Sequence, residues 1–138
     1  MSEVQNLLDF PPAPNLGVDG KLNPRKFSAD SPEMEGQALF FGKAQCSTCH
    51  PAPYYTDNSM HNLQVKRFFQ PQMINGLMAT AQGPIKTFPL RGVKDSPPYL
   101  HDGRLHTLED TVEFFNLILE LRLSESEKQS LVAFMRQL

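Results

Sequence analysis

Residues 46–50 read Cys-Ser-Thr-Cys-His, and this stretch decides how the rest of the chain is interpreted. Cys46 and Cys49 are the only cysteines among the 138 residues, and His50 follows the second one directly. Two cysteines separated by two residues have three common interpretations. They can be half of a zinc site, a redox-active thiol pair, or, when histidine follows at once, an attachment site for haem.

The surrounding sequence favours the third interpretation. A structural zinc site of this type needs a second pair of ligands, and no further cysteine is present. A thioredoxin-like pair should open a helix after a strand, whereas Pro51 and Pro53 follow this motif. In the Cys-x-x-Cys-His pattern both thiols can add to haem vinyl groups while the imidazole reaches the iron. We therefore predict one haem c, covalently held by Cys46 and Cys49, with His50 as the proximal iron ligand.

Three helices are predicted around this motif. Ser31 can cap a helix that has Pro32 at its first position and ends near Gly42, just before the motif. A second helix begins after Thr107 and carries apolar residues at helical spacing to about residue 121. A third begins after Ser124 and reaches the end of the chain. Residues 51–84 are rich in proline, glycine and asparagine and are interpreted as mostly loop.

These elements predict a mostly α fold. A helix before the motif and a capped helix at the C-terminus match the order found in class I cytochromes c, where the two terminal helices cross. Gly36 lies four residues before Phe40, so a bare spot beside an aromatic ring can allow close packing against Phe134. We expect a cytochrome c-like fold of three to five helices around one covalently bound haem, with long loops.

The composition limits the domain organisation and the classes of function that this chain can have. Seven of the twelve prolines lie in the first 53 residues, and residues 1–30 are interpreted as an extended, proline-rich arm or linker before a haem domain of residues 31–138. A net charge of −2 gives no basic footprint for nucleic acid, and no apolar run is long enough for a transmembrane segment.

The first ten residues lack the pattern of a signal peptide. Because haem is attached to this motif outside the bacterial cytoplasm, we expect a periplasmic protein whose export signal was removed or is absent from this sequence.

From about residue 36 onward the chain resembles the C-terminal haem domain of bacterial di-haem cytochrome c peroxidases and of the related MauG enzymes of methylamine utilisation. The resemblance rests on four stretches, namely GQALFFGKAQCSTCH (36–50), YYTDNSMHNLQV (54–65), TFPLRGVKDSPPYLHDGRLHTLEDTVEFFN (87–116) and LSESEKQSLVAFMRQL (123–138). It implies that Arg91, Tyr99 and His101 line the haem pocket, where a cation and a ring N–H can bind a propionate.

The chain departs from this family in two ways. In the family the helix after the HDG turn supplies the sixth iron ligand, a methionine or tyrosine fourteen residues past the histidine, and Phe115 occupies that position here. We expect Phe115 to contact the haem without binding iron. The family's peroxidases also use a second haem in a preceding domain, whereas this sequence has a single attachment motif.

The sixth ligand must then come from elsewhere or be missing. We favour Met78 and then Met73, because both lie in the run QPQMINGLMATAQGP, whose glycines allow the backbone to arch over the distal face. Met60 and His61 are alternative sixth ligands. The last alternative is an iron that has no sixth ligand. A methionine in such a pocket can also simply fill space.

Two functions are consistent with these residues. The first is single-electron transfer in the periplasm, to a redox partner protein or a larger redox enzyme. The second is peroxidase-like or small-ligand-binding chemistry at an open iron, with His61 or His101 as acid or base.

Overall fold

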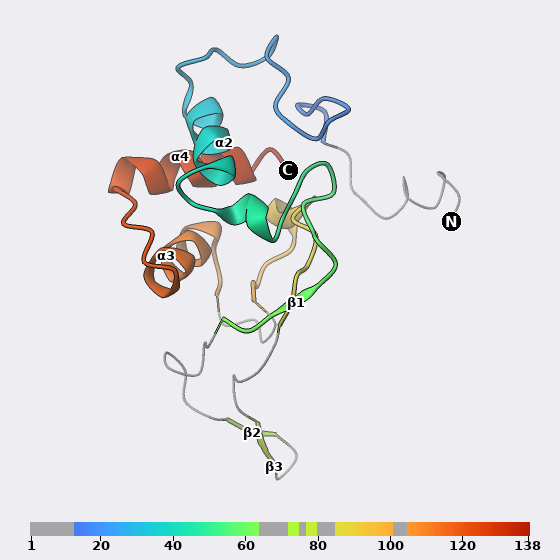
Figure 1. Cartoon of the computed structure of the whole chain (residues 1–138), viewed down its shortest axis with the longest axis vertical. Coiled ribbons are helices and arrows are strands. Elements are labelled where there is room, and N and C mark those ends of the chain that lie inside the picture. Colours follow the sequence, from blue (N-terminus) through green and yellow to red (C-terminus); the bar gives the residue numbers. More distant parts are fainter. Residues whose placement is uncertain (1–12, 64–71, 75–76, 80–84, 101–104) are drawn as a thin grey trace, which may run out of the picture.

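The structure is a computed structural model that describes residues 13–63, 72–74, 77–79, 85–100 and 105–138 (Figure 1). For strands β2 and β3 it describes the backbone. In chain order its elements are α2 (Pro32–Phe41), the 3-10 helix η1 (Cys46–Thr48), β1 (Met60–His61), β2 (Gln72–Ile74), β3 (Leu77–Ala79), β4 (Ile85–Lys86), the 3-10 helix η3 (Val93–Asp95), α3 (Leu108–Ile118) and α4 (Glu125–Met135).

The mostly helical, cytochrome c-like fold predicted from sequence is confirmed. Each α-helix begins where its capping residue predicted. The side chains of Ser31 and Thr107 accept hydrogen bonds from backbone amides three residues on, which satisfies donors that a helix start leaves open. Ser124 and Glu127 form a complete capping box at the start of α4.

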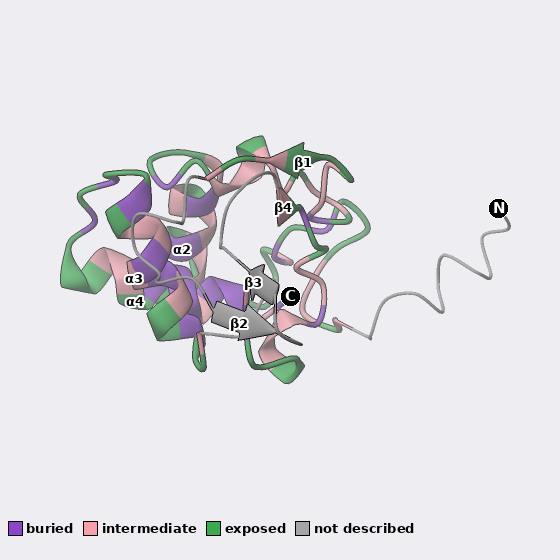
Figure 2. Cartoon of the chain, turned by 90° about the horizontal axis from the view of Figure 1, so that it is seen from below, coloured by how far each residue is buried: buried purple, intermediate pink, exposed green. Residues whose placement is uncertain are grey.

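Helix α2 crosses α4 at the contact predicted for Gly36 (Figure 1). A Cβ atom built on Gly36 would lie 1.9 Å from the carbonyl oxygen of Ser130 and 2.8 Å from Cβ of Phe134, so only glycine fits. Phe40 packs edge-on against Phe134 with ring centroids 5.3 Å apart. Figure 2 shows that the buried residues lie mainly on the helices. This crossing forms the centre of the core.

The region between the attachment motif and α3 contains more strand than the sequence analysis predicted. Strand β1 pairs antiparallel with β4, and β2 pairs antiparallel with β3. Strands of two or three residues are too short to produce a visible alternation of polar and apolar residues, which explains why the pattern indicated only loop. The β1–β4 ribbon places His61 opposite Ile85.

Residues 13–30 pack against the helices. Leu22 is only 4% exposed and belongs to the main core, and its amide donates to Oε1 of Gln37 on α2 at 2.7 Å. The Asn15 side-chain amide donates to Oε1 of Gln137, just beyond α4, also at 2.7 Å. The domain boundary at residue 30 stays a prediction, but this stretch is held to the fold at both of those helices.

Candidate functional site

The attachment motif occupies a tight turn directly after α2. Gln45 adopts a left-handed backbone conformation, and η1 then curls so that the amides of Cys49 and His50 both donate to the carbonyl of Cys46, at 3.2 and 2.9 Å. This turn brings the side chains of Cys46, Cys49 and His50 to one wall of the same cavity.

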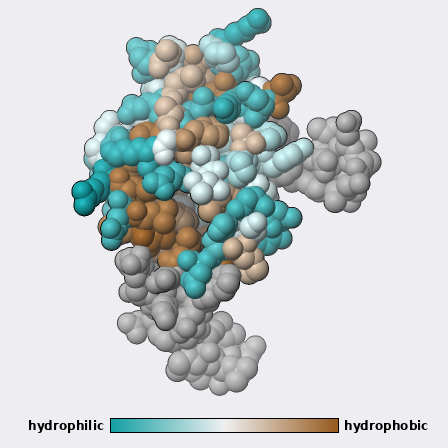
Figure 3. Space-filling model, in the orientation of Figure 1, coloured by the Kyte–Doolittle hydropathy of each residue, from teal (hydrophilic) through white to brown (hydrophobic). Residues whose placement is uncertain are grey.

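The cavity has a volume of about 610 Å³, within the range of ~300–1,000 Å³ that is usual for cofactor sites. Apolar side chains from α3, α4 and the β1–β4 region make up most of its lining, among them Leu63, Ile85, Leu90, Val112, Phe115, Leu119, Leu131 and Met135. In the space-filling view apolar residues gather over α3 (Figure 3). Such a lining suits a large, flat, mainly apolar cofactor.

His50 is held in the tautomer that an iron ligand needs. Its Nδ1 lies 2.8 Å from the backbone carbonyl oxygen of Tyr55, and because a carbonyl only accepts, Nδ1 must carry the proton. The Nε2 lone pair is then left to bind a metal. Burial lowers the pKa of His50, while the carbonyls of Tyr55 and Phe88 and the Asp57 carboxylate act in the opposite direction. The imidazole is therefore favoured in its neutral, ligating form.

The two cysteines differ in their surroundings. Burial raises the pKa of Cys46 to about 12, and its thiol donates to the carbonyl of Ala44 at 3.6 Å. The pKa of Cys49 is also raised, first by burial and then by the charge of Asp57. Both residues are therefore protonated thiols at neutral pH, and the rise in pKa is larger for Cys46.

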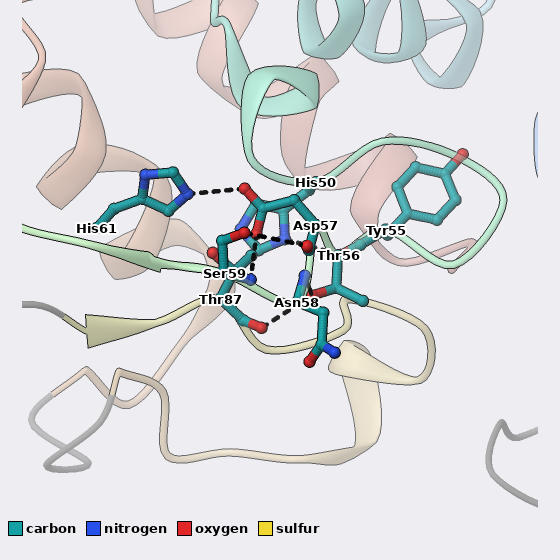
Figure 4. A network of polar contacts seen from close by, with 8 residues as sticks. All are labelled: His50, Tyr55, Thr56, Asp57, Asn58, Ser59, His61 and Thr87. Atoms are coloured by element: carbon teal, nitrogen blue, oxygen red, sulfur yellow. Dashed lines mark hydrogen bonds and ion pairs between the residues drawn. The ribbon is translucent and has the colours of Figure 1, made fainter.

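Figure 4 shows a polar network that includes Asp57 and His61. His61 and Cys49 both line the cavity. His61 Nε2 lies 2.7 Å from Oδ2 of Asp57, and this hydrogen bond is the main reason why the pKa of Asp57 falls to about 2. One ligand atom of each of Cys49, Asp57 and His61 lies within 4.8 Å of the others. The sequence analysis singled out His61 but missed Asp57, although both belong to the TDNSMHN stretch.

The same network fixes the loop after the motif. The hydroxyl of Thr56 donates to the carbonyl of Thr87 at 2.8 Å, and the amide of Thr87 donates to the carbonyl of Ser59 at 2.9 Å (Figure 4). These bonds tie residues 56–59 to the chain after β4. They fix the position of the chain after β4, which lines the cavity, relative to the loop that follows the motif.

Three further residues named from the sequence line the same cavity, namely Arg91, Tyr99 and Phe115. Arg91 Nη1 lies 3.4 Å from the carbonyl of Pro53, and the hydroxyl of Tyr99 donates to the carbonyl of Val93 at 2.9 Å. Phe115 presents only carbon atoms to the cavity. His101 lies outside the described residues. Their roles toward a cofactor stay predictions.

The candidates for a sixth ligand are less closely defined. Met73 and Met78 are paired across the β2–β3 ribbon, and their side chains lie outside what the structure describes. Met60 is 61% exposed and does not line the cavity. His61 does line it, with Nε2 bonded to Asp57. The choice among these residues stays a prediction.

The residues present fit a haem c. Two thiols stand on the cavity wall beside a neutral histidine whose Nε2 carries the lone pair, and the remaining wall is largely apolar. Cys46 and Cys49 would form the two thioether bonds and His50 would supply the proximal ligand.

Comparison with known proteins finds relatives that match most of this chain. The methylamine utilization protein MauG of Methylorubrum extorquens is 32% identical over 121 residues, which cover 75% of this chain and 33% of that protein. The cytochrome-c peroxidase IdrP2 of Pseudomonas sp. strain SCT is 30% identical over 141 residues, covering 74% of this chain and 38% of that protein. MauG and cytochrome c peroxidases are therefore homologues of this chain. A scan against models of protein families finds no match.

The match to the MauG and cytochrome c peroxidase family concerns part of each relative. The chain spans between a third and just under half of the length of the curated relatives that it matches. The cytochrome c551 peroxidase of Nitrosomonas europaea is 29% identical over 133 residues, with 39% of its length covered. These relatives identify a haem-type, cytochrome c-like domain.

Two structural findings complete the comparison. A chain of the hydrazine synthase of Kuenenia stuttgartiensis superposes with a TM-score of 0.64 at 21% identity, covering 94% of this chain and 51% of that one. This likeness concerns the fold alone. Among the residues that the structure describes, no helix is long and apolar enough to cross a membrane.

Proposed function

We propose that this chain carries one haem c, bound covalently through Cys46 and Cys49, and that it transfers single electrons to or from a redox partner protein in the periplasm. The bound haem supplies the one-electron couple, and the protein sets its potential through the proximal ligand and the surrounding cavity. No substrate site is required for this function.

The observation that carries the proposal is the hydrogen bond between His50 Nδ1 and the carbonyl of Tyr55. A histidine that only packed in a core would have no need for one fixed tautomer with its second nitrogen left available. Metal-binding histidines regularly donate their other ring N–H to a carbonyl or carboxylate, which fixes the ring and strengthens its donation. His50 has this arrangement directly beside the two cysteines.

The cavity wall supports an electron-transfer role. Apolar side chains such as Val112, Phe115 and Leu131 offer little stabilisation to the extra positive charge of ferric iron. Arg91 also lines the cavity and can neutralise a propionate, together with the ring N–H of His101 that the family resemblance suggests. Both influences favour the ferrous state and a raised potential.

Phe115 supports a second candidate function. It lies on the cavity wall and has no atom that can bind iron. If no residue from the region of Met73 and Met78 reaches the distal face, the iron is five-coordinate and can bind peroxide or another small ligand. The relatives named as peroxidases make this peroxidase-like activity the alternative proposal.

Optical spectra of the haem-loaded protein, with and without carbon monoxide, separate the two functions. A low-spin ferric spectrum with a weak near-infrared methionine–iron band and no carbon monoxide binding would support electron transfer. Met78→Ala should then open the iron to carbon monoxide, and Met73→Ala serves as the matched control. A high-spin ferric spectrum with rapid carbon monoxide binding would instead favour the peroxidase-like function.

His50→Ala tests the assignment that both functions share. It should abolish the normal spectrum while leaving the two thioether bonds intact, as measured by the mass of the denatured protein. An unchanged spectrum would overturn the proximal assignment. Fractionation of cells that express the complete protein tests the periplasmic location.

A further inference from the structure

We infer that the segment of residues 13–23 acts on the proximal ligand His50 through the hydroxyl group of Tyr55, which makes Tyr55 a positioning residue for the iron site. This inference rests on the proposed function, because it requires His50 to bind the haem iron. It concerns two contacts of Tyr55, one with His50 of the attachment motif and one with Gly20, which lies 35 residues before Tyr55.

Tyr55 connects Gly20 of the 13–23 segment to His50. Its backbone carbonyl accepts the Nδ1–H of His50 at 2.8 Å, and its side-chain hydroxyl donates to the carbonyl of Gly20 at 2.5 Å. The residue is fully buried, and its φ of 59° lies in the left-handed region that tyrosine rarely adopts. Its surroundings must therefore hold it in this conformation.

The ring of Tyr55 has little freedom to absorb a displacement. It packs against Phe40 and Phe134 with centroid distances of 5.5 and 6.3 Å, at the point where α2 crosses α4. A rigid aromatic ring that is held at its hydroxyl end and along its faces fixes the backbone from which it extends. The position of the carbonyl that faces His50 therefore depends on the hydroxyl contact at the far end.

The segment that provides this contact is itself firmly attached. Gly20 has a φ of 80°, and a Cβ atom there would lie 2.6 Å from Cα of Pro53. Leu22 is buried in the core, and Asn15 bonds to Gln137 beyond α4. The Gly20 turn thus closes directly over the loop that leads from His50 to Tyr55. Its position is defined by both terminal helices.

The expected effect has a definite sign. A well-placed carbonyl acceptor at Nδ1 makes the imidazole a stronger donor to iron, which stabilises the ferric state and lowers the reduction potential. If the hydroxyl contact is removed, the carbonyl of Tyr55 is held less firmly and the hydrogen bond to His50 weakens. The potential should then rise.

Tyr55→Phe removes the hydroxyl contact and keeps the ring, and Tyr54→Phe, at a residue that is 48% exposed, is the matched control. Redox titration of the haem-loaded protein should show a threefold to tenfold shift of the equilibrium toward ferrous iron. This corresponds to roughly 30–60 mV at about 59 mV per tenfold for one electron. The iron–histidine stretching frequency in resonance Raman spectra should fall, and Tyr54→Phe should change neither value.

Gly20→Ala perturbs the same contact at the residue whose carbonyl accepts the hydrogen bond. Gly17→Ala is its control, because a Cβ at Gly17 would meet only Asp19 Oδ1 at 3.2 Å and a more distant carbonyl. If the segment acts through Tyr55, Gly20→Ala should raise the potential as well, and the double variant should shift it no further than the larger single change. Far-UV circular dichroism must first show that each variant is folded. If one of the two single variants does not fold, the other single variant and its control test the inference.

The outcomes separate this inference from the proposed function. Folded Tyr55→Phe and Gly20→Ala proteins with wild-type potentials and stretching frequencies would overturn the inference and leave the haem assignment standing. Additive shifts in the double variant would also overturn it, because the two residues would then act independently. A wild-type chain that attaches no haem would instead remove the proposed function itself.

Discussion

Gly36→Ala tests whether the crossing of α2 and α4 organises this domain. The added Cβ would lie 1.9 Å from the carbonyl oxygen of Ser130, and ordinary contacts begin at 3.4 Å, so the helices must separate by about 1.5 Å (3.4 minus 1.9) or distort. The Ser130 carbonyl belongs to the backbone of α4 and cannot rotate away from the added Cβ. Separation would also loosen the contact between Phe40 and Phe134.

The magnitude follows from two opposing terms. Alanine in place of glycine in a helix contributes about 1 kcal/mol of stabilisation, whereas overpacking a core typically costs ~1–3 kcal/mol and occasionally more. Because the clash at Gly36 is with backbone, we place it at the upper end, for a net loss of about 2 kcal/mol. With a denaturant slope of ~1–3 kcal/mol per molar urea, the unfolding midpoint should fall by roughly 0.7–2 M.

Urea unfolding followed by far-UV circular dichroism measures this change. Ala38→Gly, on an exposed position of the same helix, is the control and should lose only the propensity term of about 1 kcal/mol. The sign of the change in the urea midpoint decides the test, because helix propensity alone predicts that Gly36→Ala stabilises the protein. A midpoint at or above that of the wild type would refute the packing argument.

Three further predictions concern the site. In the haem-free chain at pH 8, iodoacetamide should alkylate Cys46 more slowly than Cys49, because burial raises the pKa of Cys46 to about 12; equal rates in peptide mass spectrometry would contradict its buried position. The pKa of Asp57 falls from 3.8 to about 2 in the folded protein, so its stabilising contribution is complete above pH 3.8 and is lost as the pH falls through 2. Thermal unfolding between these pH values should therefore depend less on pH in Asp57→Asn. Phe115→Met should add a methionine–iron band in the near infrared if the wild-type iron is open, and a spectrum without that band would show that the side chain does not reach the iron.

Local patterns were sufficient to predict the helices, and the predicted chemistry of the motif rests on local patterns too. Capping at Ser31 and Ser124 depends on residues three positions apart, so the sequence contains all the information that the helix start needs. Gly36 was identified as a packing position for the same reason, because its neighbour Phe40 lies one helical turn away. Cys46, Cys49 and His50 carry their chemistry in five consecutive residues.

The contacts that complete the site could not be predicted from such patterns. The backbone carbonyl of Tyr55 accepts a hydrogen bond from His50 Nδ1–H, and any residue type could have supplied that carbonyl. The hydrogen bond between Asp57 and His61 joins residues four positions apart in a stretch that has no regular period. The contact of Gly20 with Tyr55 spans 35 residues and depends on how the segment folds back over the helices.

This division bears on how members of one family can differ in function. Under the proposed function the motif and the helices around it fix where a haem is attached. Relatives with names as different as methylamine utilization protein and cytochrome-c peroxidase match about three quarters of this chain. The proximal hydrogen bond is supplied by a backbone carbonyl whose position depends on the ring of Tyr55 and the turn at Gly20. Such tertiary contacts can vary between relatives while the motif stays the same, and each variation changes the donor strength of one histidine. The potential of this domain is therefore expected to depend on the segment before α2 as much as on the residues of the motif.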